Sequence, residues 1–256
     1  MKPENAMKRR QFLKGTLGVA SLGAMAGCDN LTQSGWFSSV LGMTEKVTER
    51  VQRAITPTMA LAKEYAQADV SAVFPANGNT NPGTEHYENM RQNNFTDWQV
   101  TIKGLVSKPA VFSLAALKGM PARTQITRHD CVEGWSAIGK WTGVPLGDLM
   151  RQVEPLPQAN YAVFHCADID DEGLAYYESM AVEDLFHPQT ILAYELNDQP
   201  LDVQHGAPLR LRFERQLGYK HAKYVMGVEL VASLAGIGGG QGGYWEDQGY
   251  EWYAGI

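Results

Sequence analysis

Short strand-like runs separated by turns recur through most of this 256-residue chain. Each combines β-branched and aromatic residues with polar ones, and residues 98–106 alternate as a half-buried strand does. We expect strands at 98–106, 161–167, 174–180, 190–196, 209–213 and 224–231. Strands of this kind need a second layer against which to bury their apolar faces.

Helical signals are fewer and shorter. Ser113 is a good N-cap for a short helix, and the run from Pro145 to Val153 predicts another. Residues 197–200 form a strong turn signal, and no internal repeat is visible. The sequence therefore predicts a β-rich α+β domain with short helices and long loops.

The N-terminus carries an export pattern. Arg9 and Arg10 stand before a weakly apolar run, 15–27, shorter than the about 20 residues that span a bilayer. We predict that residues 1–27 are a twin-arginine signal peptide, a type that exports folded and often cofactor-loaded proteins. The alternative is a basic stretch ahead of an apolar anchor.

Cys28 follows Met25-Ala26-Gly27, which resembles a lipobox. Lipidation of Cys28 would tie the protein to a membrane surface; the alternative is ordinary cleavage nearby. Residues 28–69 are expected to form a tether and a helical segment, because Val47 and Val51 share a helical face. The main domain is expected over 70–256, with a Gly-rich and aromatic C-terminal tail packed back on it.

The charge balance excludes some partners. The chain has 22 basic and 28 acidic residues; loss of 1–27 removes five and one, leaving 17 and 27, a net charge of −10. A surface of this sign does not favour nucleic acid. It suits an exported protein and attracts a positively charged partner.

Cys131 has the setting of a metal ligand. It ends the strand-like run 124–130 and opens the turn 132–136. A thiolate needs a metal or nearby positive charge at neutral pH, and Arg128 and His129 are close in sequence. The alternative is a disulfide with Cys166, since exported proteins usually pair their cysteines.

Three further segments join Gly or Pro to polar or cationic residues at expected strand edges: 74–78, 205–210 and 218–223. Loops of this type bring backbone N–H groups and cations against a phosphate. Taken singly, each segment also reads as a turn, an exposed strand face or a solvated surface.

Together these motifs resemble the molybdopterin-binding domain of the sulfite oxidase family, and most closely its exported bacterial branch, which includes periplasmic methionine-sulfoxide reductases. The resemblance covers about 74–234. The residues that carry it are RHDCVEGWS at 128–136, WTGVPL at 141–146, HGAPLR at 205–210 and GYKHAK at 218–223.

The resemblance implies a molybdenum-molybdopterin cofactor and a β-rich fold with short helices. Cys131 would be the protein's thiolate ligand to molybdenum. Asn77 would lie near the pterin, a position that Asn81 or Asn89 could also fill, and Cys166 would contact the pterin unpaired. The implied contacts to the pterin and its phosphate are His205, Arg210, Gly218, Tyr219 and Lys220, with Lys223 a weaker member.

One departure bears on the substrate. Sulfite oxidases carry an arginine shortly after the ligand cysteine, whereas this chain has none over 132–139 and has Glu133 instead. A carboxylate there would repel sulfite. The expected reaction is two-electron oxygen-atom transfer, in particular reduction of an S-oxide or N-oxide, with Glu133 as proton donor or as a loop-positioning group.

The electron partner is expected to be a separate protein. No C-x-x-C-H haem motif is present, so we expect a membrane cytochrome b or a soluble cytochrome c. Two alternatives are a sulfite-oxidising enzyme of the same family and a non-enzymatic exported binding lipoprotein that kept the fold.

Overall fold

The structure is a computed structural model that describes residues 47–54, 59–170 and 172–256. The chain divides into two compact units, 1–55 and 56–256. In the first unit, residues 47–54 are helical. The expected signal peptide and Cys28 lie outside the described residues. No helix in the described part of the chain is both long and apolar enough to cross a membrane.

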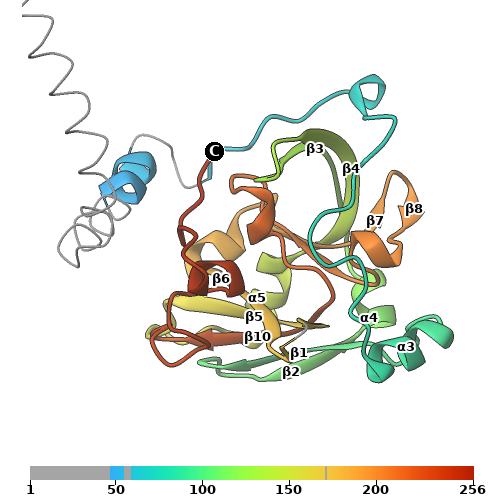
Figure 1. The fold of residues 1–256 in the computed structure, drawn as a ribbon. Coiled ribbons are helices and arrows are strands. Elements are labelled where there is room, and N and C mark those ends of the chain that lie inside the picture. Colours follow the sequence, from blue (N-terminus) through green and yellow to red (C-terminus); the bar gives the residue numbers. More distant parts are fainter. Residues whose placement is uncertain (1–46, 55–58, 171) are drawn as a thin grey trace, which may run out of the picture. The chain divides into compact units, whose positions relative to one another are not determined.

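The second unit contains two five-stranded sheets (Figure 1). In the first sheet only the β1–β10 pair is parallel, and the other neighbours are antiparallel. Its strands, in spatial order, are β2 (Ala110–Ser113), β1 (Gln99–Gly104), β10 (Val225–Val231), β5 (Tyr161–Ile169) and β6 (Ala175–Ala181).

The second sheet is antiparallel and holds the strand that leads to Cys131. Its main path is β3 (Arg123–Asp130), β4 (Ser136–Pro145), β7 (Ile191–Leu196) and β8 (Gln199–Pro200), with β9 (Arg210–Arg212) also paired to β7. β4 was not predicted as a strand. It contains Gly139 and Gly143, which lower the strand signal, yet a Cβ at Gly143 would overlap the Leu192 backbone of β7.

The helices are short, as the sequence predicts. Ser113 caps α4 by accepting a hydrogen bond from the Ala116 N–H (3.1 Å), and α5 begins directly after Pro145. α3 was not predicted; Thr84 caps it. The helices are α3 (Glu85–Gln92), α4 (Leu114–Lys118), α5 (Leu146–Val153) and α6 (Tyr244–Asp247), and the 3₁₀ helices are η1 (Gln67–Asp69), η2 (Val182–Phe186), η3 (Val203–His205) and η4 (Gly218–Lys220).

A large apolar core joins both sheets, and a second, smaller one packs on β4 and β7. The large core contains residues from β1, β5 and β10 of the first sheet, from β4, β7 and β9 of the second, and from α4 and α5. A fold that buries both sheets against the same core and carries few short helices confirms the predicted β-rich α+β class.

A strap of residues 60–66 covers the outer edge of β3. The Tyr65 N–H donates to the Ile126 carbonyl (2.9 Å), and Glu64 pairs with Thr127. The Gln189 side chain accepts from the Ala62 N–H (2.8 Å) and donates to the Ala62 carbonyl (3.0 Å). The Tyr65 bond satisfies a backbone carbonyl that an edge strand otherwise leaves open, and the Gln189 bonds hold the strap itself in place.

Candidate cofactor site

Cys131 lies at the tip of the β3–β4 hairpin. Its N–H donates to the Trp135 carbonyl (2.9 Å), and its carbonyl accepts from the Gly134 N–H (3.1 Å). The turn closes at Gly134, whose φ of 89° favours glycine. The hairpin therefore presents the Cys131 thiol from a fixed turn.

The surroundings of Cys131 do not favour a free thiolate. Burial raises the pKa of the thiol, and the Glu133 carboxylate adds to this rise. Arg128 is paired with Asp130 (2.9 Å). Burial, with Arg212 contributing, lowers the pKa of His129 well below its usual value and keeps the ring neutral. Neither neighbour supplies the positive charge expected of it, so ionisation of Cys131 requires a charge from a bound group such as a metal.

A cavity of about 760 Å³ opens beside Cys131. Its walls come from segments far apart in the sequence, including the C-terminal tail. The lining residues are Asn77, Gly78, Asn79, Asn81, Pro82, Gly83, Cys131, Val132, Glu133, Asp168, Ile169, Asp170, Leu174, Tyr176, Gly218, Tyr219, His221, Lys223, Tyr244, Trp245 and Tyr250.

Five of the nine predicted site residues line this cavity: Asn77, Cys131, Glu133, Gly218 and Tyr219. The other four, Cys166, His205, Arg210 and Lys220, are not among the residues that line the cavity. The side chains of His205, Arg210 and Lys220 are bonded to protein groups. Direct contact of these residues with the cofactor stays a prediction.

His205 and Lys223 fix the loop that carries Asn77. The ring Nε2 of His205 lies 2.9 Å from the Phe74 carbonyl, and its Nδ1 lies 2.6 Å from Asp202. The Lys223 ammonium donates to the Asn77 carbonyl (2.7 Å) and also to the carbonyl of Asn79. Burial lowers the pKa of Lys223 to about 7. The loop at 74–79 is thereby joined to the predicted segments 205–210 and 218–223.

Arg210 is fully buried and bonded to backbone. It donates to the carbonyls of His205 (3.0 Å) and His221 (3.4 Å), and its Nε has no partner in the described structure. Burial lowers its pKa to about 9, with Arg212 contributing. Arg210 therefore connects the 205–210 segment to the 218–223 segment.

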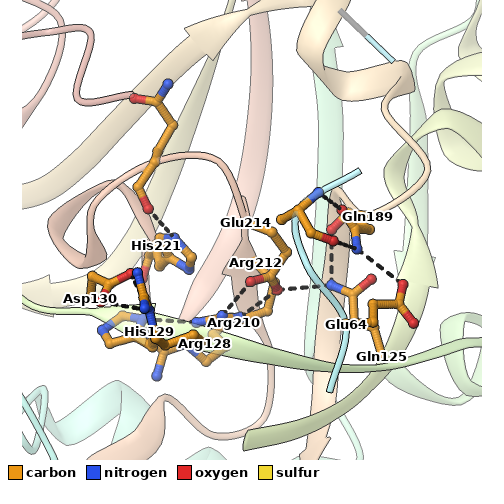
Figure 2. A network of polar contacts seen from close by, with 12 residues as sticks. Glu64, Gln125, Arg128, His129, Asp130, Gln189, Arg210, Arg212, Glu214 and His221 are labelled. Carbon is orange, nitrogen blue, oxygen red and sulfur yellow. Dashed lines mark hydrogen bonds and ion pairs between the residues drawn. The ribbon is translucent and has the colours of Figure 1, made fainter. Parts of the chain in front are cut away.

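Arg212, missed from the sequence, supports the same wall. It makes two hydrogen bonds to Glu214 (2.9 and 2.6 Å) and lies 2.9 Å from His129 Nδ1, as Figure 2 shows. Gly218 packs so closely on His129 that a Cβ at Gly218 would overlap His129 Nε2. The hairpin behind Cys131 is thus packed directly against the 218–223 segment.

Lys220 turns away from the cavity. Its ammonium is bonded to both Glu178 and Glu246, and all three side chains are buried. Glu246 belongs to α6. The interaction therefore fastens the C-terminal tail to β6 and η4, in agreement with the expectation that the tail packs on the domain.

Cys131 and Cys166 are both free thiols, so the disulfide alternative is not realised. Cys166 lies on β5 opposite Val225 of β10. Burial raises its pKa well above the usual value, with Asp168 adding to the rise. A thiol with this pKa stays neutral.

Several cavity residues were missed from the sequence. Asp168, Asn79 and His221 contribute polar groups, and Tyr176 contributes an aromatic ring. Tyr244, Trp245 and Tyr250 come from the aromatic C-terminal tail, which the sequence predicts to pack on the domain. His221 could have been found, because it stands within the GYKHAK motif at 218–223.

Comparison with known proteins defines the family. The model described as "Oxidoreductase molybdopterin binding domain" matches residues 86–235. A protein of Azospira oryzae named "Putative protein-methionine-sulfoxide reductase subunit YedZ1" is 34% identical over 249 residues, which cover 96% of this chain and 87% of the relative. The chain belongs to the oxidoreductase molybdopterin-binding domain family, in the sulfite oxidase-like group.

Two further proteins are similar to a smaller part of this chain. "Protein-methionine-sulfoxide reductase catalytic subunit MsrP" of Xanthomonas campestris is 35% identical over 54% of this chain, and the match spans 46% of that protein. The crystal structure of the sulfane dehydrogenase SoxCD from Paracoccus pantotrophus is 23% identical, with a TM-score of 0.48, and the match covers 54% of this chain and 39% of that one.

The family confirms the predicted enzyme class and cofactor: the chain is a molybdopterin-dependent oxidoreductase whose cofactor is molybdenum-molybdopterin. The non-enzymatic alternative is therefore wrong. The residues present fit this group. The cavity holds a thiol for a soft metal, and its walls contain buried hydrogen-bonding atoms of Asp168 and His221 that have no protein partner in the described structure.

Proposed function

We propose that this chain is an exported oxidoreductase that reduces an S-oxide or N-oxide and exchanges electrons with a separate cytochrome. The observation that carries the proposal is the carboxylate of Glu133, which lines the cavity beside Cys131. The Trp135 indole N–H donates to Glu133 Oε2 (3.0 Å), and the Gly78 N–H lies 3.5 Å from Oε1.

The charge at this position selects between substrate classes. A carboxylate in a cavity of reduced dielectric repels an anion such as sulfite, whereas an S-oxide or N-oxide carries no net charge. The Lys223 ammonium also lines the cavity, but it is bonded to the carbonyls of Asn77, Asn79 and Gln204 and burial lowers its pKa to about 7, so it offsets the charge of Glu133 only in part. A neutral oxide therefore fits the site better than sulfite does.

The protein's own groups would hold the cofactor and handle protons. Bound molybdenum-molybdopterin supplies the two-electron oxygen-atom transfer. Cys131 would bind the metal as a thiolate, and the cofactor phosphate would meet the wall formed by Gly218 and Tyr219, with Lys223 as the cation that lines the cavity there. Reduction of an S-oxide consumes two electrons and two protons and releases water, and Glu133 would deliver a proton to the departing oxygen.

The N-terminal sequence supports export and attachment. The twin-arginine pattern at Arg9-Arg10 suits a protein loaded with its cofactor before export to the periplasm. A lipid on Cys28 would hold the domain near a membrane cytochrome b and raise the effective concentration of the two proteins. The Azospira relative is named as a subunit of a reductase, which supports a separate electron partner.

The test is a substrate screen of the molybdenum-loaded full chain. With a reduced viologen dye as electron donor, we expect turnover of S-oxides or N-oxides and slow or no oxidation of sulfite when it is tested separately with an electron acceptor. The Cys131→Ser variant, prepared in parallel, should be inactive and should contain less molybdenum. Fast sulfite oxidation by the wild-type protein would overturn the substrate assignment, and an active Cys131→Ser variant would overturn the ligand assignment.

A further inference from the structure

The C-terminal tail brings aromatic rings to the cavity. Tyr244, Trp245 and Tyr250 of the tail line it, although the match to the molybdopterin-binding family ends at residue 235. Two tyrosines of the family domain line the same cavity, Tyr176 on β6 and Tyr219 on η4. The domain shared by the family therefore does not account for the part of the wall that the tail adds.

These five rings form one continuous surface, which we call the aromatic wall. Neighbouring ring centroids lie 5.5 Å apart for Tyr176 and Tyr244, and 5.3 Å apart for Tyr244 and Trp245. The distances are 5.4 Å from Trp245 to Tyr250 and 5.2 Å from Tyr250 to Tyr219. All four distances fall in the range at which aromatic pairs attract each other, about 4.5–7 Å. The rings therefore support one another in place.

Three of the four tyrosine hydroxyls in the wall donate to protein groups. The Tyr176 hydroxyl donates to the Tyr219 carbonyl (2.8 Å), and the Tyr219 hydroxyl to the Glu251 carbonyl (2.6 Å). The Tyr244 hydroxyl donates to Asp170 (2.9 Å). Since these donors are occupied, the wall offers a ligand mainly the carbon surface of its rings.

The wall reaches the solvent-exposed part of the cavity lining. Tyr250 is 41% exposed, and two further apolar residues of the lining are also exposed, Val132 (45%) and Leu174 (53%). Single exposed apolar side chains are common, whereas several around one opening mark a place where a ligand binds. An exposed position suits a molecule that enters and leaves at each turnover.

We propose that the aromatic wall binds the apolar substituent of the oxide, so that the enzyme takes oxides with a bulky, uncharged group in preference to small ones. A ring or a long aliphatic chain buries apolar surface against the wall. The carboxylates of Glu133 and Asp170 line the same cavity and would repel a substituent with negative charge. The inference rests on the proposed function, because it concerns the substrate of that reaction.

The test compares two substrates that differ in one substituent. Methyl phenyl sulfoxide carries a phenyl group where dimethyl sulfoxide carries a methyl group. Reduction of each by the molybdenum-loaded full chain is measured with a reduced viologen dye. We expect kcat/KM for methyl phenyl sulfoxide to be about ten-fold higher or more. Equal values would refute the inference alone, whereas no reduction of either probe or of an N-oxide would refute the proposed function as well.

Since the two probes also differ in intrinsic reactivity, the decisive quantity is how their ratio of kcat/KM changes in variants. The ratio should fall several-fold in Tyr250→Ala and in Trp245→Ala, mainly through a higher KM for methyl phenyl sulfoxide. Tyr250→Phe keeps the ring and should keep the ratio. An unchanged ratio in both alanine variants would overturn the proposal, and so would an equal fall in Tyr250→Phe, because the hydroxyl would then be the binding group.

Binding without turnover is measured with the corresponding sulfones as inhibitors. The inhibition constant of methyl phenyl sulfone should rise several-fold in Tyr250→Ala, and that of dimethyl sulfone should change less. Equal changes for the two sulfones would contradict a role in binding the larger substituent.

Phe186→Ala is the matched control. Phe186 on η2 is similarly exposed (37%) but is not among the residues that line the cavity, so this variant should leave the ratio unchanged. An equal fall in the control would overturn the assignment, because the effect would not depend on the cavity. Molybdenum and pterin contents should be the same in all variants. Loss of the cofactor from Trp245→Ala, with thermal unfolding unchanged, would assign the wall to the cofactor and not to the substrate.

Discussion

Glu133 and Asp168 both place a carboxyl group in the cavity wall, but their surroundings differ. Glu133 stands beside the thiol and has hydrogen bonds from Trp135 and, at longer range, Gly78. Asp168 is buried with one oxygen unpaired. We propose the first as the proton donor at the reacting centre, whereas burial raises the pKa of the second.

Replacement of Glu133 separates its two expected roles. Glu133→Gln keeps an oxygen that can accept from Trp135 but loses the acidic proton, so we expect S-oxide reduction to fall by about 10²-fold or more with the molybdenum content unchanged. The measurement is steady-state turnover together with metal analysis. If Glu133→Gln stays active while Glu133→Ala is inactive, the residue only positions the loop.

Asp168 should make the cofactor-free protein less stable at neutral pH. Its pKa rises from 3.8 to about 6 on folding, so between these values the folded state holds more protons than the unfolded state, and stability falls as pH rises. Asp168→Asn removes this cost. We expect the free energy of unfolding to increase by up to about 3 kcal/mol at pH 7, and the gain to disappear below about pH 4.

Urea unfolding of both proteins across this pH range is the measurement. Asp170→Asn serves as a control of opposite sign, since backbone hydrogen bonds, chiefly from Leu174, lower the pKa of Asp170. That variant should lose stability near pH 7. A pH-independent difference between the wild-type protein and Asp168→Asn would contradict the account.

At the scale of elements, the short helix α6 closes the cavity through one buried interaction. Tyr244 and Trp245 of α6 line the cavity, while Glu246 faces the opposite way, toward Lys220 and Glu178. Further along the tail, the Tyr219 hydroxyl donates to the Glu251 carbonyl (2.6 Å). These bonds therefore connect the cavity wall formed by η4 to the cavity wall formed by the C-terminal tail.

Replacement of Lys220 should lower the free energy of unfolding. Lys220→Met leaves two buried carboxylates without a cation, and we expect a loss of about 3–5 kcal/mol in the free energy of unfolding. Chemical denaturation measures this loss, and hydrogen exchange should show faster opening of the tail. Lys108→Met is the matched control: its pair with Glu154 is exposed, so it should cost less than about 1 kcal/mol. Equal losses in the two variants would refute the role of the buried lysine.

Local patterns were sufficient for most strands but not for all elements. The strands expected at 161–167, 190–196 and 224–231 correspond to β5, β7 and β10 within two residues at each end, because these runs are rich in β-branched, aromatic and other apolar residues that the fold mostly buries. β4 was missed because the close approach of β7 at Gly143 is a tertiary requirement. α3 was missed because its sequence is polar and only Tyr87 in it is buried.

The segments that form the site were predicted more accurately than the individual residues that line it. The motifs located the Cys131 hairpin and the 218–223 segment, and the structure brings both to one cavity. Which lysine of that segment faces the cavity depends on Glu178 and Glu246, residues that no local pattern relates to Lys220. Asp168 was missed for a similar reason, since the register shift that accompanies it is a property of the β5–β6 pair.

At the scale of the whole molecule, the two sheets share one core, and the loops at their ends form one cavity around a single thiol. The central claim is that Cys131 binds the molybdenum of the cofactor. X-ray absorption at the molybdenum edge of the loaded wild-type protein and of the Cys131→Ser variant tests it most directly. We expect one fewer sulfur neighbour of molybdenum in the variant; an unchanged sulfur count with the metal retained would show that Cys131 is not a ligand.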